Sequence, residues 1–129
     1  MPPYRDLKAW EHGRRLAIEC AKAARRFPEY EQDALADQLR RPGYSIPLNI
    51  AEGSARKGSR EYKRYLDTAA ASLAEVETIL GIAKELGYIA PADHTRVENV
   101  ATETGKTLYG LLRKIGGASQ KGERTQAKA

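Results

Sequence analysis

A heptad repeat of apolar residues between positions 60 and 87 constrains the fold of this chain more than any other feature. Apolar side chains recur there at alternating spacings of four and three, at Tyr62, Leu66, Ala69, Leu73, Val76, Leu80 and Ala83. This spacing is typical of an α-helix that packs one face against other helices. A second row widens the stripe beyond a two-stranded seam and consists of Tyr65, Ser72, Ile79 and Leu86. The segment therefore predicts one long helix, with Ser59 as its N-cap and Gly87 as its C-cap.

Two further segments have helical spacing of their apolar residues. The first covers residues 7–27, before Pro28, and its apolar residues are Leu7, Trp10, Ala17, Ala21, Ala24 and Phe27. The last begins near Pro91, which suits a first helical turn, and stops at Gly116-Gly117. Its stripe is Val97, Val100, Thr104, Leu108, Leu111 and Ile115. Because residues 118–129 contain no large apolar side chain, we expect one domain at 1–117 followed by a disordered polar tail.

Two prolines interrupt the remaining helical pattern, in the stretch RRPGYSIPLNIAEGS. A proline inside a helix lacks an amide and crowds the carbonyl four residues earlier, at a cost of about 3 kcal/mol. We therefore predict a helix over residues 31–56 that is broken near Pro42 and bent at Pro47. Since the connections are short, neighbouring helices should be antiparallel. The expected fold is all-α, an up-down-up-down antiparallel four-helix bundle whose second helix is kinked near Pro42 and Pro47.

Composition excludes several classes of protein. Cys20 is the single cysteine, so neither a disulfide framework nor a thiolate metal site is expected. No apolar run reaches the length of a membrane span, and the first residues lack a signal-peptide core. We therefore expect a soluble, cytoplasmic protein without a membrane partner. No cofactor is expected, because no phosphate-binding glycine loop, zinc spacing or catalytic triad is present. Lys and Arg number 22 against 17 Asp and Glu, an excess that permits nucleic-acid binding without requiring it.

A polar face lies beside the second proline. Ser45, Asn49 and Glu52 are spaced to share one side of a helix, and Glu75 of the next helix is able to approach them. One interpretation is an acid–base or metal site built on paired carboxylates. The other, which we favour, is a hydrogen-bonded network that caps the carbonyls freed by Pro47 and aligns two helices. The predicted structural motif comprises Ser45, Pro47, Asn49, Glu52, Gly53 and Glu75.

A basic cluster at the turn between the second and third helices is the stronger functional candidate. It consists of Arg56, Lys57, Arg60, Lys63 and Arg64. Only Glu61 opposes it within that span, and the free amides that open the third helix add partial positive charge. The cluster is suited to hold the phosphates of RNA or DNA. The alternative is a solvated helix end whose charges only maintain solubility.

Small residues occupy the outer face of the third helix beyond this cluster. They are Ala70, Ala71, Ala74 and Gly81. A surface of small residues lets a neighbouring backbone approach closely and leaves a weakly polar strip when nothing covers it. We therefore predict these residues as contacts between copies of the chain, although alanine is also simply the best helix former.

A longer stretch resembles a known family. The segments QLRRPGYSIPLNIAEGSARKGSREYKRYL and SLAEVETILGIAKELGYI resemble the four-helix bundle proteins also called ribosomal RNA intervening-sequence proteins, over residues 4–115. The resemblance implies a bundle that assembles into a homopentamer. Some members are encoded inside insertions of large-subunit ribosomal RNA genes. A related branch is the accessory protein beside the reverse transcriptase of diversity-generating retroelements, where it contacts nucleic acid. This chain departs from the family at Pro42-Gly43-Tyr44 and at Ala69–Ser72.

One short motif points to an enzyme. The segment RDLKAWEH, from Arg5 to His12, fits the arginine–polar–histidine pattern of HEPN ribonucleases. The alternative interpretation is structural, with Asp6 as a helix N-cap and His12 on the exposed face. Three hypotheses result. The favoured one is a non-enzymatic homo-oligomer, a pentamer by resemblance, that binds RNA or DNA through the basic cluster. The second is an oligomeric scaffold for a protein partner such as a reverse transcriptase, and the least favoured is the ribonuclease.

Overall fold

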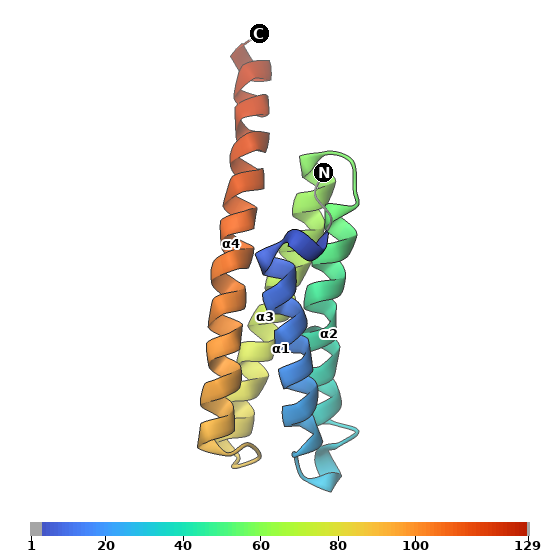
Figure 1. Ribbon diagram of the computed structural model, residues 1–129, viewed down its shortest axis with the longest axis vertical. Helices are drawn as coiled ribbons and strands as arrows, with labels where there is room; N and C mark the ends of the chain where they lie inside the picture. Colours follow the sequence, from blue (N-terminus) through green and yellow to red (C-terminus); the bar gives the residue numbers. More distant parts are fainter. Residues whose placement is uncertain (1–3, 129) are drawn as a thin grey trace.

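Four helices account for most of the chain in the computed structural model, which describes residues 4–128 and the side chains up to residue 116. A short 3-10 turn, η1 (Tyr4–Asp6), precedes α1 (Lys8–Arg25), and a second, η2 (Glu29–Glu31), precedes α2 (Leu35–Ser54). The chain continues with α3 (Ser59–Glu85) and α4 (Pro91–Lys128). Successive helices run in opposite directions (Figure 1). The predicted all-α, up-down-up-down four-helix bundle is therefore confirmed.

The helices pack as a closed ring of neighbours around one core. α1 packs against α2 and α4, and α3 packs against the same two helices from the other side. Every residue of the predicted heptad seam on α3 is buried, whereas Leu86 of the second row is 56% exposed. The fully buried side chains that meet this seam include Leu16, Leu39, Ile46, Ile50, Val97 and Leu108. Burial of one such side chain contributes roughly 1.5–3 kcal/mol, so the seam supplies much of the fold's stability.

Helix α2 passes through both prolines without interruption, so the predicted break near Pro42 is wrong. Pro42 and Gly43 are buried, and a Cβ atom on Gly43 would lie only 3.1 Å from Cβ of Cys20 on α1. The absence of a side chain at Gly43 therefore lets α2 lie very close to α1. Packing of α2 against α1 at this point offsets the cost of the prolines. Because this contact joins two helices that are distant in sequence, the local sequence does not reveal it. The helix is also shorter than the predicted 31–56.

The two ends of α3 differ in how well they were predicted. Its N-cap is Gly58, with φ of 87°, rather than Ser59, which is the first helical residue. At the other end Gly87 has φ of 75°, a conformation that glycine adopts without strain. Its amide donates to the carbonyl of Lys84 at 3.1 Å, and the amide of Tyr88 donates to Ala83 at 2.8 Å. These paired bonds form a Schellman motif, and the predicted glycine end is confirmed.

Helix α4 continues to Lys128, past Gly116-Gly117 where the sequence predicts its end. Glycine inside a helix costs about 1 kcal/mol relative to alanine, which weakens a helix without ending it. Residues 118–128 are part of this helix, and α4 extends beyond the other three helices in Figure 1. The domain boundary at 117 and the disordered polar tail after it stay predictions. None of the described helices is long and apolar enough to cross a membrane.

Candidate nucleic-acid interface

The turn between α2 and α3 gathers the predicted basic cluster at one end of the bundle. All five side chains, Arg56, Lys57, Arg60, Lys63 and Arg64, are exposed. Gly58 lies inside this turn, so the first amides of α3, a helix of 27 residues, open beside Lys57 and Arg60. Those amides carry the partial positive charge of a helix N-terminus. The structure therefore brings cations and amide donors together, as the sequence suggests.

Intrahelical ion pairs neutralise part of this charge. Arg56 pairs with Glu52, Lys63 Nζ lies 2.9 Å from Asp67 Oδ2, and Arg64 Nη2 lies 3.3 Å from Glu61 Oε2. Glu61 lies inside the cluster, whereas Glu52 and Asp67 lie one helical turn outside it and were missed from the sequence. The i,i+4 spacing of Arg56 with Glu52 and of Lys63 with Asp67 was the signal for these two pairs.

Lys57 and Arg60 are the two members of the cluster that form no ion pair within the described part of the chain. The pairs of the other three members are exposed, and exposed pairs contribute only about 0–1 kcal/mol. A phosphate is therefore able to compete for the paired cations as well. The cluster keeps its capacity for anions, with Lys57 and Arg60 as the most available positions.

Tyr65 joins the cluster although sequence reasoning assigned it no function. The guanidinium carbon of Arg56 lies 5.1 Å from the centre of the Tyr65 ring, and that of Arg64 lies 5.7 Å from it. Both distances are within the range of cation–π attraction. Gly53 of α2 lies directly against Tyr65, because a Cβ atom on Gly53 would lie 2.8 Å from Cβ of Tyr65. Gly53 thus sets the separation of α2 and α3 beneath the basic cluster.

The polar face near Pro47 is a link between helices. Asn49 Nδ2 donates to the carbonyl oxygen and to Oγ of Ser45, both at 2.8 Å. Ser72 Oγ on α3 donates to Ser45 Oγ at 2.9 Å, which connects α3 to α2. The carbonyl that Asn49 reaches is that of Ser45, whereas Pro47 removes the amide partner of Gly43. The network aligns two helices, as the structural interpretation predicts, but these bonds do not cap the freed carbonyl.

The two carboxylates assigned to this motif lie outside the network. Glu52 pairs with Arg56, and Glu75 is exposed on α3. No group of three or more His, Cys, Asp or Glu side chains able to bind a metal occurs among the described residues. The paired-carboxylate site that the sequence left open is therefore not assembled in this part of the chain.

The residues of the ribonuclease motif have separate contacts. His12 Nδ1 lies 3.1 Å from Thr107 Oγ1 on α4, and His12 is half-buried rather than exposed. Arg5 is exposed, with its guanidinium carbon 5.7 Å from the ring centre of Tyr4. The N-cap of α1 is Leu7, so the expected capping role of Asp6 is wrong. His12 thus joins α1 to α4 through a hydroxyl on the facing helix.

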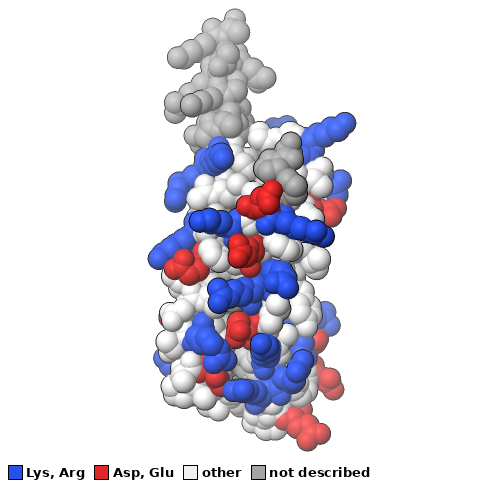
Figure 2. All heavy atoms as spheres, in the orientation of Figure 1, with Lys and Arg blue, Asp and Glu red and all other residues white. Residues whose placement is uncertain are grey.

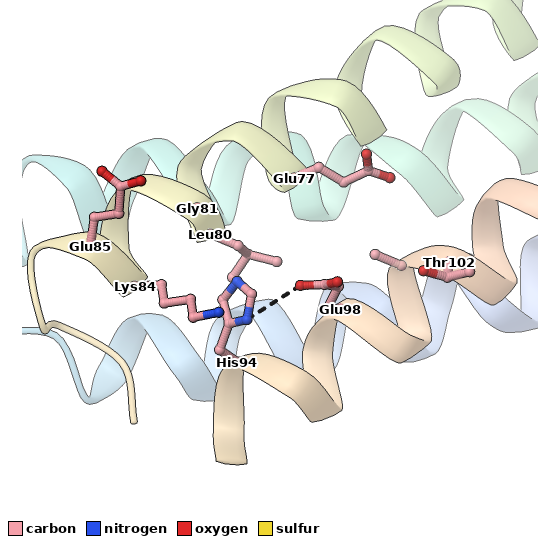
Figure 3. A pocket seen from close by; sticks show the side chains of 9 residues that line it. Glu77, Leu80, Gly81, Lys84, Glu85, His94, Glu98 and Thr102 are labelled. Carbon is pink, nitrogen blue, oxygen red and sulfur yellow. Dashed lines mark ion pairs between the residues drawn. The ribbon is translucent and has the colours of Figure 1, made fainter. Parts of the chain in front are cut away.

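The predicted oligomer contacts lie in two environments on α3. Ala71 and Ala74 are exposed, whereas Ala70 packs partly against the core. Gly81 opens onto a groove between α3 and α4 with a volume of about 570 Å³, which we call the acidic groove (Figure 3). The charged and polar groups that line it are Glu77, Lys84, Glu85, His94, Glu98 and Thr102.

His94 lies at the base of the acidic groove and was given no role by the sequence reasoning. Its side chain is buried, and Nδ1 lies 3.3 Å from Glu98 Oε2 (Figure 3). The two residues are one helical turn apart on α4, and this i,i+4 spacing was the available signal. The pair positions the Glu98 carboxylate along the wall of the acidic groove.

A second basic surface, which sequence reasoning missed, lies on the outer face of α1. The exposed cations of α1 that form no ion pair in the described chain are Lys8, Arg14, Arg15, Lys22 and Arg25. Figure 2 shows Lys and Arg side chains over the α1 side of the molecule, with fewer acidic side chains between them. Of the acidic residues of α1, Glu19 is engaged by Arg96 of α4 at 3.2 Å, whereas Glu11 is exposed one helical turn from Arg14 and Arg15. Because another helix binds Glu19, the sequence alone does not show how much positive charge is left unpaired on α1.

A groove of about 370 Å³ runs between α1 and α2 beside these cations, and we call it the basic groove. Three cations line it, Arg14, Lys22 and Arg25, together with the apolar or aromatic residues Ala17, Ile18, Ala21, Tyr44 and Pro47. Ile18 is 40% exposed and Tyr44 is 47% exposed. The groove therefore combines unpaired positive charge with uncovered apolar surface.

Two groups have pKa values shifted by clear physical causes. Burial, with a smaller contribution from Glu19, raises the pKa of the Cys20 thiol to about 12, so this thiol stays protonated at neutral pH. A hydrogen bond from Arg96, aided by Arg26, lowers the pKa of Asp93. Arg96 Nη1 lies 2.9 Å from Asp93 Oδ1, and Arg26 Nη1 lies 2.8 Å from Asp93 Oδ2. The Arg26–Asp93 pair joins the end of α1 to α4, whereas the Arg96–Asp93 pair lies within α4.

Comparison with known proteins identifies the family. Residues 5–110 match the family described as 23S rRNA-intervening sequence protein. A solved structure from Bacteroides thetaiotaomicron, described as a protein with unknown function from the S23 ribosomal protein family, has the same fold, with a TM-score of 0.74. The two chains are 22% identical, and the similarity covers 81% of this chain and 98% of the other. No curated protein matches the chain. The chain belongs to the 23S rRNA-intervening sequence protein family.

Proposed function

We propose that this protein is a non-enzymatic homo-oligomer that binds the phosphate backbone of RNA or DNA at the turn between α2 and α3. The observation that supports this most directly is the position of Lys57 and Arg60. Both are exposed, neither has an ion pair in the described chain, and both lie beside the free amides of a long helix. Cations and oriented amides are the donors that phosphates prefer.

Tyr65 extends the proposed site from charge to shape. The guanidinium groups of Arg56 and Arg64 lie within cation–π distance of the tyrosine ring, so arginine planes and an aromatic ring are grouped at the same site. Arginine planes and aromatic rings both accept stacked bases in unpaired nucleic acid, with little preference among bases. Single-stranded segments are therefore the favoured ligand, bound without sequence specificity.

Association of several copies would multiply this weak site. Each copy contributes only two unpaired cations, and linked sites bind more tightly than isolated ones because the later contacts are intramolecular. The family resemblance implies a homopentamer, and exposed Ala71, Ala74 and Ile82 on α3 offer apolar surface for contact between copies. Light scattering is expected to give about five times the 14.3 kDa chain mass.

A salt titration tests the nucleic-acid proposal. Fluorescence anisotropy with a labelled single-stranded RNA and DNA is expected to show binding that weakens steeply as salt rises. Replacing Lys57 and Arg60 by Ala is expected to reduce the log–log salt slope by about 1.4, since each phosphate contact on a single strand contributes roughly 0.7.

The matched control replaces Lys84 and Lys114 by Ala, two exposed cations outside both the basic cluster and the α1 surface. This variant is expected to keep the wild-type slope. Absence of binding at low salt, or an equal loss in both variants, would refute the proposed site.

Purified protein is also expected to leave the RNA intact, and cleavage that required both Arg5 and His12 would restore the ribonuclease hypothesis.

A protein scaffold is the second candidate, and exposed apolar side chains favour it. Leu48 is 67% exposed on α2, one helical turn from the exposed Tyr44. Large apolar side chains grouped on a surface commonly mark a protein contact. In this alternative the partner would be another protein, such as one that itself handles nucleic acid, and the wild type would show no salt-dependent binding.

A further inference from the structure

A cavity of about 710 Å³ lies between the end of α1, the turn that joins α3 to α4 and the first turn of α4, and we call it the α1–α4 cavity. The basic cluster, at the turn between α2 and α3, lies at the opposite end of the bundle (Figure 1). Small-molecule sites usually occupy about 300–1,000 Å³. The α1–α4 cavity is therefore large enough for an organic ligand.

Positive charge dominates the lining of this cavity. The cations that line it are Lys22, Arg25, Arg26 and Arg96, and Asp93 is the single carboxylate among the described residues that do so. Arg26 and Arg96 both pair with Asp93, and Arg96 also contacts Glu19 at 3.2 Å. Lys22 and Arg25 form no ion pair in the described chain and, at i,i+3 spacing, lie side by side on α1. The cavity thus has two cations left for an anionic ligand.

The carboxylate of Asp93 shows what kind of group this arrangement holds. Arg26 Nη1 donates to its Oδ2 at 2.8 Å, and Arg96 Nη1 donates to its Oδ1 at 2.9 Å. Two guanidinium groups, one from the end of α1 and one from α4, thus converge on one anionic group. Guanidinium groups bind phosphate oxygens in the same way. An incoming phosphate is therefore suited to bind Lys22 and Arg25 and to compete with Asp93 for the two arginines.

We propose that the α1–α4 cavity binds a nucleotide, with the phosphate groups at Lys22 and Arg25 and the base beside Tyr88. This site takes a small molecule and is separate from the proposed nucleic-acid site at the α2–α3 turn. Neither site needs the other, because they lie at opposite ends of the bundle (Figure 1).

The aromatic side of the cavity favours a nucleotide among phosphorylated molecules. Tyr88 lines the cavity, and the ring centre of Tyr30, which is 74% exposed, lies 6.0 Å from that of Tyr88. Aromatic rings accept stacked bases with little preference among them. The contact with the Tyr30 hydroxyl, together with burial and nearby Glu31, raises the pKa of Tyr88. The negative charge of Glu31 near this tyrosine favours the uncharged base there and the phosphates at the cations.

Isothermal titration calorimetry of the full chain with ADP tests the proposal. Lys22→Ala with Arg25→Ala is expected to weaken ADP binding by about tenfold or more, because hydrogen bonds between charged groups are among the strongest that proteins form. The matched control is Arg14→Ala, which removes an unpaired cation that lines the basic groove but not this cavity. It is expected to keep the wild-type affinity, and circular dichroism verifies that both variants are folded. Absence of ADP binding to the wild type, or an equal loss in both variants, would overturn the proposal.

Asp93→Asn separates the proposed competition from a general effect on the fold. Removal of the carboxylate leaves Arg26 and Arg96 available to the phosphates, so ADP is expected to bind several-fold more tightly although the bundle becomes less stable. The matched control is Glu77→Gln, which removes an exposed carboxylate of α3 outside the cavity and is expected to leave ADP binding unchanged. Unchanged or weaker binding to Asp93→Asn would contradict the competition.

The choice of ligand identifies which part of the nucleotide is bound. Adenosine is expected not to bind, and pyrophosphate is expected to bind more weakly than ADP. Adenosine as tight as ADP would contradict the phosphate contacts, and pyrophosphate as tight as ADP would contradict the contact with the base.

Two further measurements separate this site from the proposed nucleic-acid site. A single-stranded oligonucleotide that displaces ADP would assign Lys22 and Arg25 to an extended strand and overturn the small-molecule site. Lys57→Ala with Arg60→Ala is expected to leave ADP binding unchanged while it weakens nucleic-acid binding. Each site can therefore fail on its own, and a parallel loss of ADP binding in this variant would overturn the separation of the two sites.

Discussion

Gly53→Ala should destabilise the bundle although alanine is the better helix former. A Cβ atom at position 53 would lie 2.8 Å from Cβ of Tyr65, 3.1 Å from Cδ1 of Tyr62 and 3.3 Å from the Tyr62 carbonyl oxygen. The first and last of these atoms belong to the α3 backbone or its immediate branch, so rotation of a side chain cannot relieve the contact. Helices α2 and α3 would have to move apart.

The expected loss follows from two opposing terms. Overpacking of a tight contact typically costs about 1–3 kcal/mol, and replacement of glycine inside a helix returns at most about 1 kcal/mol. Gly53 is next to the last residue of α2, so the return is smaller there. We expect a net loss of about 1–2 kcal/mol, or roughly 3–10 °C in Tm for a chain of this size.

Thermal unfolding followed by circular dichroism measures this difference at one fixed protein concentration. The matched control is Gly110→Ala on α4, where a Cβ atom would meet nothing within 4 Å and the helical gain of up to about 1 kcal/mol should appear alone. A Gly53→Ala protein as stable as the wild type would refute the close-approach reasoning.

Two further predictions concern titratable groups. Because burial raises the pKa of Cys20 to about 12, native protein should resist iodoacetamide at pH 8, while protein unfolded in guanidinium should react at the rate of a free thiol; equal labelling of both states would show that Cys20 is accessible. Because Arg96 and Arg26 lower the pKa of Asp93 in the folded state, its contribution to stability is present above the unfolded pKa and is lost as pH falls through the folded pKa. Asp93→Asn should therefore lower Tm at pH 7 and change it little at strongly acidic pH, and a constant difference across that range would contradict the ion-pair origin.

Local patterns predicted the parts of the fold that depend on local physics. The heptad seam of α3 and the glycine after its end both follow from helical geometry within a few residues, and both are confirmed. The break expected at Pro42 is wrong because its outcome depends on how closely Gly43 approaches Cys20, which lies on another helix. A proline's local cost is readable from sequence, whereas the packing that offsets it is not.

The candidate site shows the same division. The sequence placed the basic residues at one turn correctly, but it left out the pairs with Glu52 and Asp67 that helical spacing would have shown. The free cations of α1 could not be recognised in the same way. Their acidic neighbour Glu19 is engaged by Arg96, which lies 77 positions later in the chain. Only the folded bundle decides which charges on α1 are left for another molecule.

The ion pairs between α1 and α4 also bear on the order in which the bundle assembles. Arg26 and Asp93 are separated by 67 positions and Glu19 and Arg96 by 77, whereas each pair of successive helices is joined by a short connection. Closing a long loop costs more chain entropy than closing a short one, so contacts between successive helices are favoured to form before the α1–α4 seam. Contacts formed after the transition state influence unfolding more than folding. The ion pairs between α1 and α4 are therefore expected to slow unfolding of the bundle more than they speed its folding.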